Sequence, residues 1–139
     1  LTPLDRSYVR RALAGTALAI GLAFTLRVMP PFTPSPEQNL VYRSGIWYER
    51  NRETVGTLYV NHPWFFYAWG HDKYDPEFAA ITHENLARAR TGDAVIMESH
   101  YSHRLEGDVR FAFFEDNPDY EILGVEHAGK NWCGVIRKR

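Results

Sequence analysis

The chain has 139 residues and a mass of 16.1 kDa, which corresponds to one domain of modest size. Its 45% hydrophobic and 24% charged residues are globular proportions, and they exclude a disordered or collagen-like chain. The single cysteine, Cys133, cannot form an internal disulfide or a thiolate metal cluster. The net charge of −1 lacks the basic excess of proteins that neutralise phosphate backbones, so we expect no nucleic-acid partner.

The N-terminal region contains a run of 15 uncharged residues, Ala12 to Leu26. Arg10 and Arg11 precede this run and Arg27 follows it. At about 1.5 Å per residue the run spans roughly 22 Å, less than the ~30 Å hydrocarbon core of a bilayer. Apolar neighbours and arginines that snorkel to the headgroups would extend it. We therefore predict one membrane helix with its flanks over residues 1–29.

Two alternatives to a membrane helix stay open, namely a cleaved signal peptide and a buried helix of a soluble domain. A signal peptide would end in small residues at a cleavage site, whereas Arg27-Val28-Met29-Pro30-Pro31 follows the run. Because Leu1 is not a methionine and lies close to the run, we expect the chain to be the tail of a longer protein. The run would then be the last of several spans.

The basic residues predict how the chain is oriented in a membrane. Arg6, Arg10 and Arg11 lie before the run and only Arg27 lies close after it. The positive-inside rule therefore keeps the N-terminal side cytoplasmic, and we expect the rest of the chain outside the cytoplasm, at the inner (plasma) membrane. Residues 30–36 hold four prolines and predict a stiff linker, followed by an extracytoplasmic domain over residues 37–139.

The first part of the domain predicts a helix and then a strand. Ser35 can cap a helix that begins with Pro36, Gln38 completes a capping box, and apolar residues at helical spacing continue to near Asn51. The β-branched and apolar run Val55–Val60 predicts a strand.

The second part predicts a helix, a strand and a hairpin. A helix is expected between Pro76 and Arg90, with Asp75 or Thr82 as its cap, followed by a strand over Ala94–Met97. Tyr120–Glu126 and Trp132–Lys138 are extended runs joined through a short connection that contains glycine, which predicts an antiparallel hairpin.

The order of these elements predicts an α/β fold. A strand, a helix and a strand at this spacing form a parallel pair with a right-handed crossover. We therefore expect a small mixed sheet of two or three layers, with a parallel βαβ unit and a C-terminal antiparallel hairpin, preceded by the membrane helix.

Polar clusters follow both predicted parallel strands. Ligands gather at the carboxyl ends of the strands in open α/β sheets, so two neighbouring strands would bring these clusters face to face. The candidate ligand-binding residues are Asn61, His62, Trp64, Glu98, His100, Tyr101 and His103.

The second cluster has the side chains of a metal site. His100 and His103, with Glu98, Glu106 and Asp108, offer nitrogen and oxygen ligands. No helical pattern or sulfur partner fixes the two histidines, so we predict no bound metal and no cofactor. The simpler interpretation is that Glu98 and His100 satisfy each other or nearby backbone groups.

Nucleophilic and nucleotide-binding motifs are missing from the sequence. Ser99 stands beside His100 without a G-x-S-x-G elbow, and no glycine-rich phosphate loop occurs. The aromatic run after the first strand, which comprises Trp64, Phe65, Phe66, Tyr67 and Trp69, has three possible roles. These are core packing, contact with a membrane interface, and a platform on which sugars stack.

The sequence resembles a known family from about Ala12 to Arg139. The apolar run, the proline-rich linker, NHPWFFY (61–67), TGDAVIMESHYSHRLEGDV (91–109) and the closing hairpin together carry the resemblance. They are similar to the C-terminal soluble region of bacterial multi-span glycosyltransferases of the GT-C class, of the dolichyl-phosphate-mannose protein mannosyltransferase-like and aminoarabinose transferase-like kinds.

The resemblance implies transfer of a sugar from a polyprenyl-phosphate carrier to an acceptor outside the cytoplasm. The acidic catalytic residues of that family lie in loops that precede the part matched here, so the resemblance assigns no catalytic residue and implies that this piece is inactive alone. The sugar carrier and the acceptor would be partners through the missing region. The alternatives are a single-span, membrane-anchored module that binds a ligand or partner without enzyme activity, and a small metal-dependent hydrolase.

Overall fold

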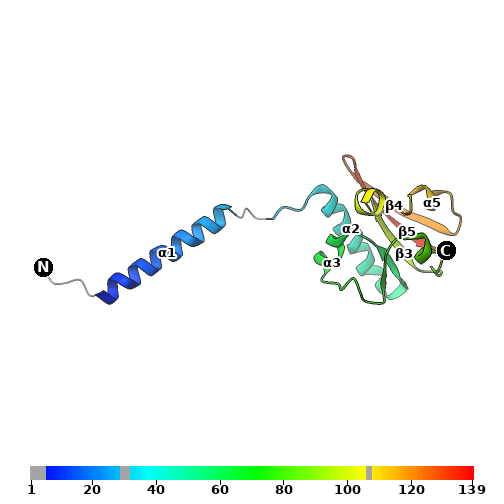
Figure 1. Cartoon of the computed structure of the whole chain (residues 1–139). Coiled ribbons are helices and arrows are strands. Elements are labelled where there is room, and N and C mark those ends of the chain that lie inside the picture. The colour runs from blue at the N-terminus through cyan, green and yellow to red at the C-terminus, as the bar shows by residue number, and fades with distance from the viewer. Residues whose placement is uncertain (1–5, 29–31, 106–107) are drawn as a thin grey trace. The chain divides into compact units, whose positions relative to one another are not determined.

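The computed structural model describes residues 6–28, 32–105 and 108–139, which belong to two compact units. Leu1–Thr33 is the first unit and Pro34–Arg139 is the second. The first unit holds helix α1 (Arg6–Val28), and the second holds all the strands and the remaining helices (Figure 1). Each unit is described by itself.

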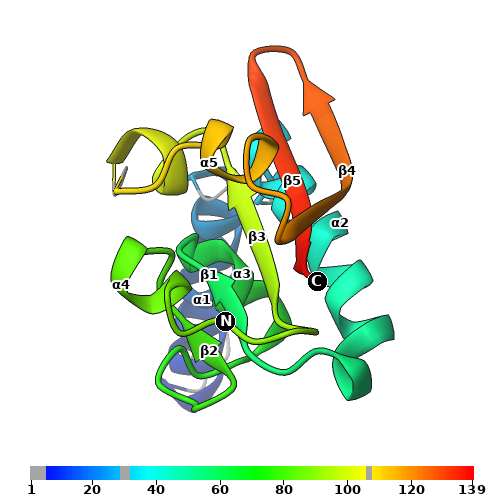
Figure 2. The same cartoon turned by 90° about the vertical axis from the view of Figure 1, so that its right-hand side faces the viewer.

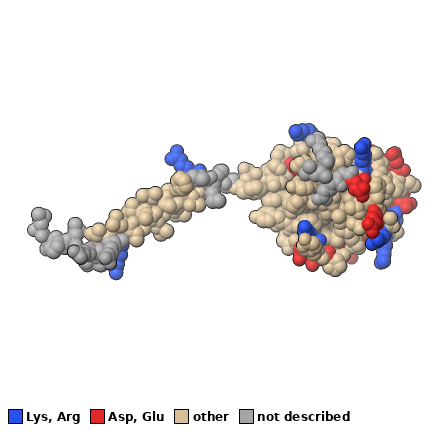
Figure 3. Space-filling view, viewed as in Figure 1, with Lys and Arg blue, Asp and Glu red and all other residues tan. Residues whose placement is uncertain are grey.

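Helix α1 exposes apolar side chains along its length. Five large apolar residues of α1 have exposed fractions between 61% and 76%, namely Leu13, Leu18, Ile20, Leu22 and Phe24. Thr25 Oγ1 donates to the Gly21 carbonyl (2.9 Å), so this hydroxyl is satisfied within the helix. The described part of α1 carries charged side chains near its ends and none between them (Figure 3). Among the described residues, no helix has both the length and the apolarity needed to cross a membrane.

Helix α2 (Pro36–Asn51) opens the second unit and begins at the predicted cap. Ser35 Oγ accepts from the Gln38 backbone N–H (3.2 Å), and Gln38 Oε1 accepts from the Ser35 N–H (2.7 Å). The capping box is therefore confirmed. A short 3₁₀ turn, η1 (Arg52–Thr54), follows, and the predicted strand is observed as β1 (Leu58–Val60).

The segment between the two parallel strands differs from the prediction. The sequence predicts one helix there, whereas the structure has α3 (Pro63–Trp69), the short strand β2 (Phe78–Ala79) and α4 (His83–Leu86). The predicted helix is thus confined to a single turn, which Thr82 caps by accepting from the Asn85 N–H (3.1 Å). Phe78 and Ala79 are extended because they pair with β1 at the edge of the sheet.

The sheet has five strands in the order β2-β1-β3-β5-β4. β3 (Ala94–Glu98) is parallel to β1 and antiparallel to β5 (Asn131–Lys138), which also pairs with β4 (Tyr120–Ala128). Figure 2 shows β3 between β1 and β5, and the tip of the β4–β5 hairpin projecting beyond the sheet. The mixed sheet, its parallel pair and its C-terminal hairpin are therefore confirmed.

Two apolar cores lie on opposite faces of the sheet, giving three layers. Side chains alternate along a strand, so Ala94 and Ile96 of β3 face one core, and Val95 and Met97 face the other. Helices α2 and α3 pack on the first face, whereas α4 and α5 (Ala112–Glu115) pack on the second. Glu98 continues the alternation of Ala94 and Ile96, which places it on the face covered by α2 and α3.

Candidate functional site

The structure brings the ends of the two parallel strands together. β1 and β3 are neighbours, with Val60 opposite Ile96, so the residues that follow them meet at one edge of the sheet. Ligand atoms of Glu37, His62 and Glu98 all lie within 4.8 Å of one another there. His100 Nδ1 also lies 3.2 Å from Glu37 Oε1. We call these four residues the strand-end cluster.

His62 links the strand-end cluster to α3. Its Nδ1 accepts from the Trp64 backbone N–H (3.0 Å) and caps the helix. The neutral ring therefore carries its proton on Nε2, which donates to Glu37 Oε1 (3.2 Å). Burial lowers the pKa of His62, and this outweighs the opposite effects of Glu98 and Glu37, so the buried ring is kept neutral.

Glu98 is fully buried and organises the chain that follows β3. Its Oε2 accepts from the His100 backbone N–H (2.5 Å), and its Oε1 accepts from the N–H (2.6 Å) and the hydroxyl (3.1 Å) of Ser102. These bonds hold the start of η2 (Tyr101–Leu105), a single π-helical turn. The sequence pattern did not predict this turn. It did leave open that Glu98 bonds nearby backbone groups, and that contact is present.

Tyr101 closes one side of the strand-end cluster. Its ring packs edge-on against His62 (centroids 4.8 Å apart) and His100 (5.2 Å). His62 is buried, whereas nearly half of the His100 side chain is exposed (46%). His100 is therefore the member of the cluster that solvent and ligands reach most easily.

Other residues proposed from the sequence make their contacts with residues outside the strand-end cluster. Asn61 Oδ1 accepts from the Ile81 N–H (2.7 Å), and His103 packs edge-on against Trp132. Asp108 accepts from the His83 N–H (2.8 Å), and Glu106 lies outside the described residues. Ser99 Oγ accepts from the Trp132 N–H (3.2 Å), which is a structural contact.

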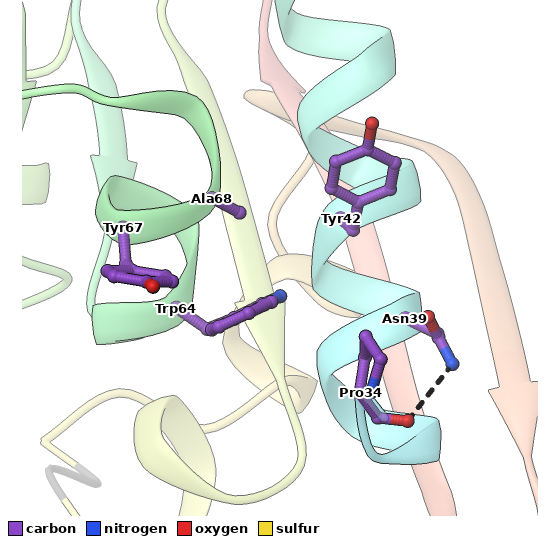
Figure 4. Close-up of a pocket in the computed structure, with 6 residues that line it drawn as sticks. All are labelled: Pro34, Asn39, Tyr42, Trp64, Tyr67 and Ala68. Carbon is purple, nitrogen blue, oxygen red and sulfur yellow. Dashed lines mark hydrogen bonds between the residues drawn. The ribbon is translucent and has the colours of Figure 1, made fainter. Parts of the chain in front are cut away.

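An aromatic cleft of about 440 Å³ lies between α2 and α3 (Figure 4). Trp64 and Tyr67 project from α3, with ring centroids 5.1 Å apart, and Tyr42 projects from α2. Tyr67 is 77% exposed and Tyr42 is 43% exposed. The residues that line the cleft are Pro34, Asn39, Tyr42, Trp64, Tyr67 and Ala68.

The structure places part of the aromatic run in the core and part of it at the surface. Phe65 is fully buried in the core, and Phe66 and Trp69 pack against it. Trp64 also packs against this core, but one part of it lines the cleft together with Tyr67. Core packing and an open aromatic surface thus coexist in one short helix.

The aromatic cleft and the strand-end cluster are neighbours in the chain. On α2, Glu37 of the cluster lies two residues before Asn39 of the cleft, and at the start of α3, His62 lies two residues before Trp64. Sequence reasoning missed Glu37 and the α2 side of the cleft. The only signal for Glu37 is its place in the first turn of a helix, where acidic residues are common for dipole reasons alone.

Comparison with known proteins gives no relative, since no family model, curated protein or solved structure matches the chain.

Proposed function

We propose that the chain is the C-terminal extracytoplasmic domain of a membrane glycosyltransferase and that it binds carbohydrate in the aromatic cleft. The transferase would move a sugar from a polyprenyl-phosphate carrier to an acceptor outside the cytoplasm. The observation that carries the proposal is the cleft itself, in which exposed faces of Tyr42, Trp64 and Tyr67 are combined with the polar side chain of Asn39. Aromatic rings cover the apolar faces of a sugar, and a few polar groups fix its orientation.

The strand-end cluster adds hydrogen-bonding groups on the same segments that form the cleft, since Glu37 lies on α2 with Asn39 and His62 caps α3. His100 is half-exposed, and Glu37 orients its ring through Nδ1. Within the described part of the chain, Nε2 of this ring has no hydrogen-bond partner, so this nitrogen can bond a hydroxyl group. Together with the resemblance over residues 61–67 and 91–109, this polar edge supports a carbohydrate ligand over a purely apolar one.

The membrane part of the proposal concerns α1. Its large apolar side chains are exposed within its own unit, and the run from Ala12 to Leu26 carries no charge. A helix that is apolar all round is covered by protein or by lipid, and arginines at both ends of the run can reach the headgroups. We propose that lipid of the inner membrane covers α1.

Carbohydrate binding is tested by titrating the whole chain, in detergent micelles, with methyl glycosides of hexoses and pentoses. We expect binding that is followed in NMR spectra and that weakens in Trp64→Ala and Tyr67→Ala. Tyr74→Ala is the matched control, because Tyr74 is equally exposed (81%) but lies outside the cleft. Absence of binding, or equal binding by all the variants, would contradict a carbohydrate site in the cleft.

The transferase itself is tested by the DNA upstream of the codon for Leu1. We expect an open reading frame that continues upstream and encodes several apolar spans. A start codon with a ribosome-binding site directly before this codon would contradict the transferase. It would favour a single-span anchored module.

A further inference from the structure

We propose that Glu37, His62 and Glu98 bind one divalent transition-metal ion, with Zn²⁺ as the best match. The three side chains offer one imidazole nitrogen and carboxylate oxygens, which is a donor set that zinc accepts. This inference is independent of the carbohydrate proposal. It also differs from the His100 and His103 pair in the sequence, since His103 packs against Trp132.

The first argument is the charge of the strand-end cluster. Glu98 is fully buried and only 17% of the Glu37 side chain is exposed. Within the described ranges, neither carboxylate pairs with a lysine or arginine; the ion-pair partners of Glu37 are His62 and His100. Beyond the hydrogen bonds that Glu98 accepts, two carboxylates so close together and so little exposed are stabilised by a nearby positive charge, because buried negative charge is costly. A divalent ion supplies that charge.

The second argument is geometry. His62 Nε2 and Glu37 Oε1 are 3.2 Å apart, and all three ligand atoms fall within 4.8 Å. Bonds of about 2.0–2.2 Å to zinc place tetrahedral ligand atoms roughly 3.5 Å apart. Side-chain rotations that move the ligand atoms by about 1 Å therefore complete the site. Three protein ligands leave one position for water or an oxygen ligand.

Metal binding would have a specific signature at Trp64. The Trp64 backbone N–H now donates to His62 Nδ1, which places the proton of the neutral ring on Nε2. A metal ion on Nε2 displaces that proton. If the proton moves to Nδ1, the bond from Trp64 is lost, so the Trp64 amide resonance reports on binding at His62.

The test uses the whole chain in detergent micelles, freed of metal with a chelator and titrated with zinc chloride. We expect about one zinc per chain by elemental analysis, and weaker binding by calorimetry in Glu37→Gln and His62→Asn. Asparagine at position 62 can still cap α3 while it removes the ring. Because even outer-shell changes weaken metal sites roughly 10- to 100-fold, each variant should lose at least about tenfold in affinity.

Glu49→Gln is the matched control, because Glu49 also lies on α2 and its Oε1 contacts a histidine ring, that of His71 (2.6 Å). Its zinc affinity should stay at the wild-type value. Three results would each overturn the proposal: no zinc bound by the wild type, full affinity in both ligand variants, or loss of zinc only in a His100→Ala and His103→Ala double variant. Should a ligand variant fail to fold, the wild-type spectrum decides, since an unshifted Trp64 amide excludes zinc at His62.

Discussion

At Gly45 the backbone of α2 lies directly against the indole of Trp69. A Cβ atom added at this position would lie 2.0 Å from Trp69 Nε1 and 2.7 Å from Cδ1, so the ring would have to move. Tyr42 also stacks on the Trp69 ring, with centroids 4.9 Å apart. Gly45 therefore sets how closely α3 approaches α2 beside the aromatic cleft.

Gly45→Ala should destabilise the protein despite the better helix propensity of alanine. Propensity favours alanine by about 1 kcal/mol, whereas overpacking costs about 1 to 3 kcal/mol. We expect a net loss in the free energy of unfolding, measured with urea, and a changed tryptophan fluorescence spectrum. Gly124→Ala is the control, because no atom lies within 4 Å of its added Cβ. A more stable Gly45→Ala variant would show that Trp69 packs elsewhere.

The residues of the candidate site differ in how far the sequence reveals them. His62 and Glu98 are predictable because His62 follows one recognisable strand and Glu98 ends the other, and parallel strands end at one edge of a sheet. Glu37 is not, since its role depends on how α2 docks against the sheet. Asn61 stands beside His62 in the sequence, yet it bonds Ile81, because successive residues of an extended chain point to opposite sides.

At the scale of single elements, the start of α2 positions both Glu37 and Asn39. In the reciprocal bonds between Ser35 and Gln38, each side chain accepts from the backbone N–H of the other residue. Two amide groups at this helix end are thus satisfied. Ser35→Ala removes the acceptor for the Gln38 N–H and should cost about 1 kcal/mol in the free energy of unfolding. Ser35→Asn should restore most of this loss, because asparagine caps equally well. Equal stability of the alanine variant in urea titrations would contradict a role for the cap.

Elements defined by local signals were predictable, and those defined by tertiary contacts were not. Helix α2 has its capping box in the sequence, and the β4–β5 hairpin has a turn glycine, Gly129, at a positive φ of 64°. By contrast, β2 is only Phe78–Ala79 and exists through pairing with β1. The turn η2 depends on hydrogen bonds to the buried Glu98 carboxylate, and the periodicity of the sequence does not predict these bonds.

At the scale of the whole molecule, the orientation in a membrane remains a prediction that cysteine labelling can test. Burial raises the pKa of the Cys133 thiol to about 12, so this thiol is neutral at pH 8. The same burial makes it inaccessible to reagents in solution. Wild-type protein should not react with an impermeant maleimide. A Lys130→Cys variant places a thiol at the exposed hairpin tip, and it should react on intact spheroplasts.

Cys133 serves as the internal control of this experiment, because its reaction would report unfolding. Its contact with Ser44 Oγ (3.1 Å) argues for leaving it in place. Reaction of Lys130→Cys only after lysis would reverse the orientation and place the second unit in the cytoplasm.

The position of β5 has a consequence for biosynthesis. β3 is the central strand of the sheet, and its second pairing partner is β5, the last of the described strands in chain order. While the chain emerges from the ribosome or the translocon, β3 therefore presents an unpaired, apolar edge until Asn131–Lys138 has followed. Such edges recruit strands from other chains. We therefore expect a nascent chain that stalls before Asn131–Lys138 to keep this edge exposed to chaperones and proteases.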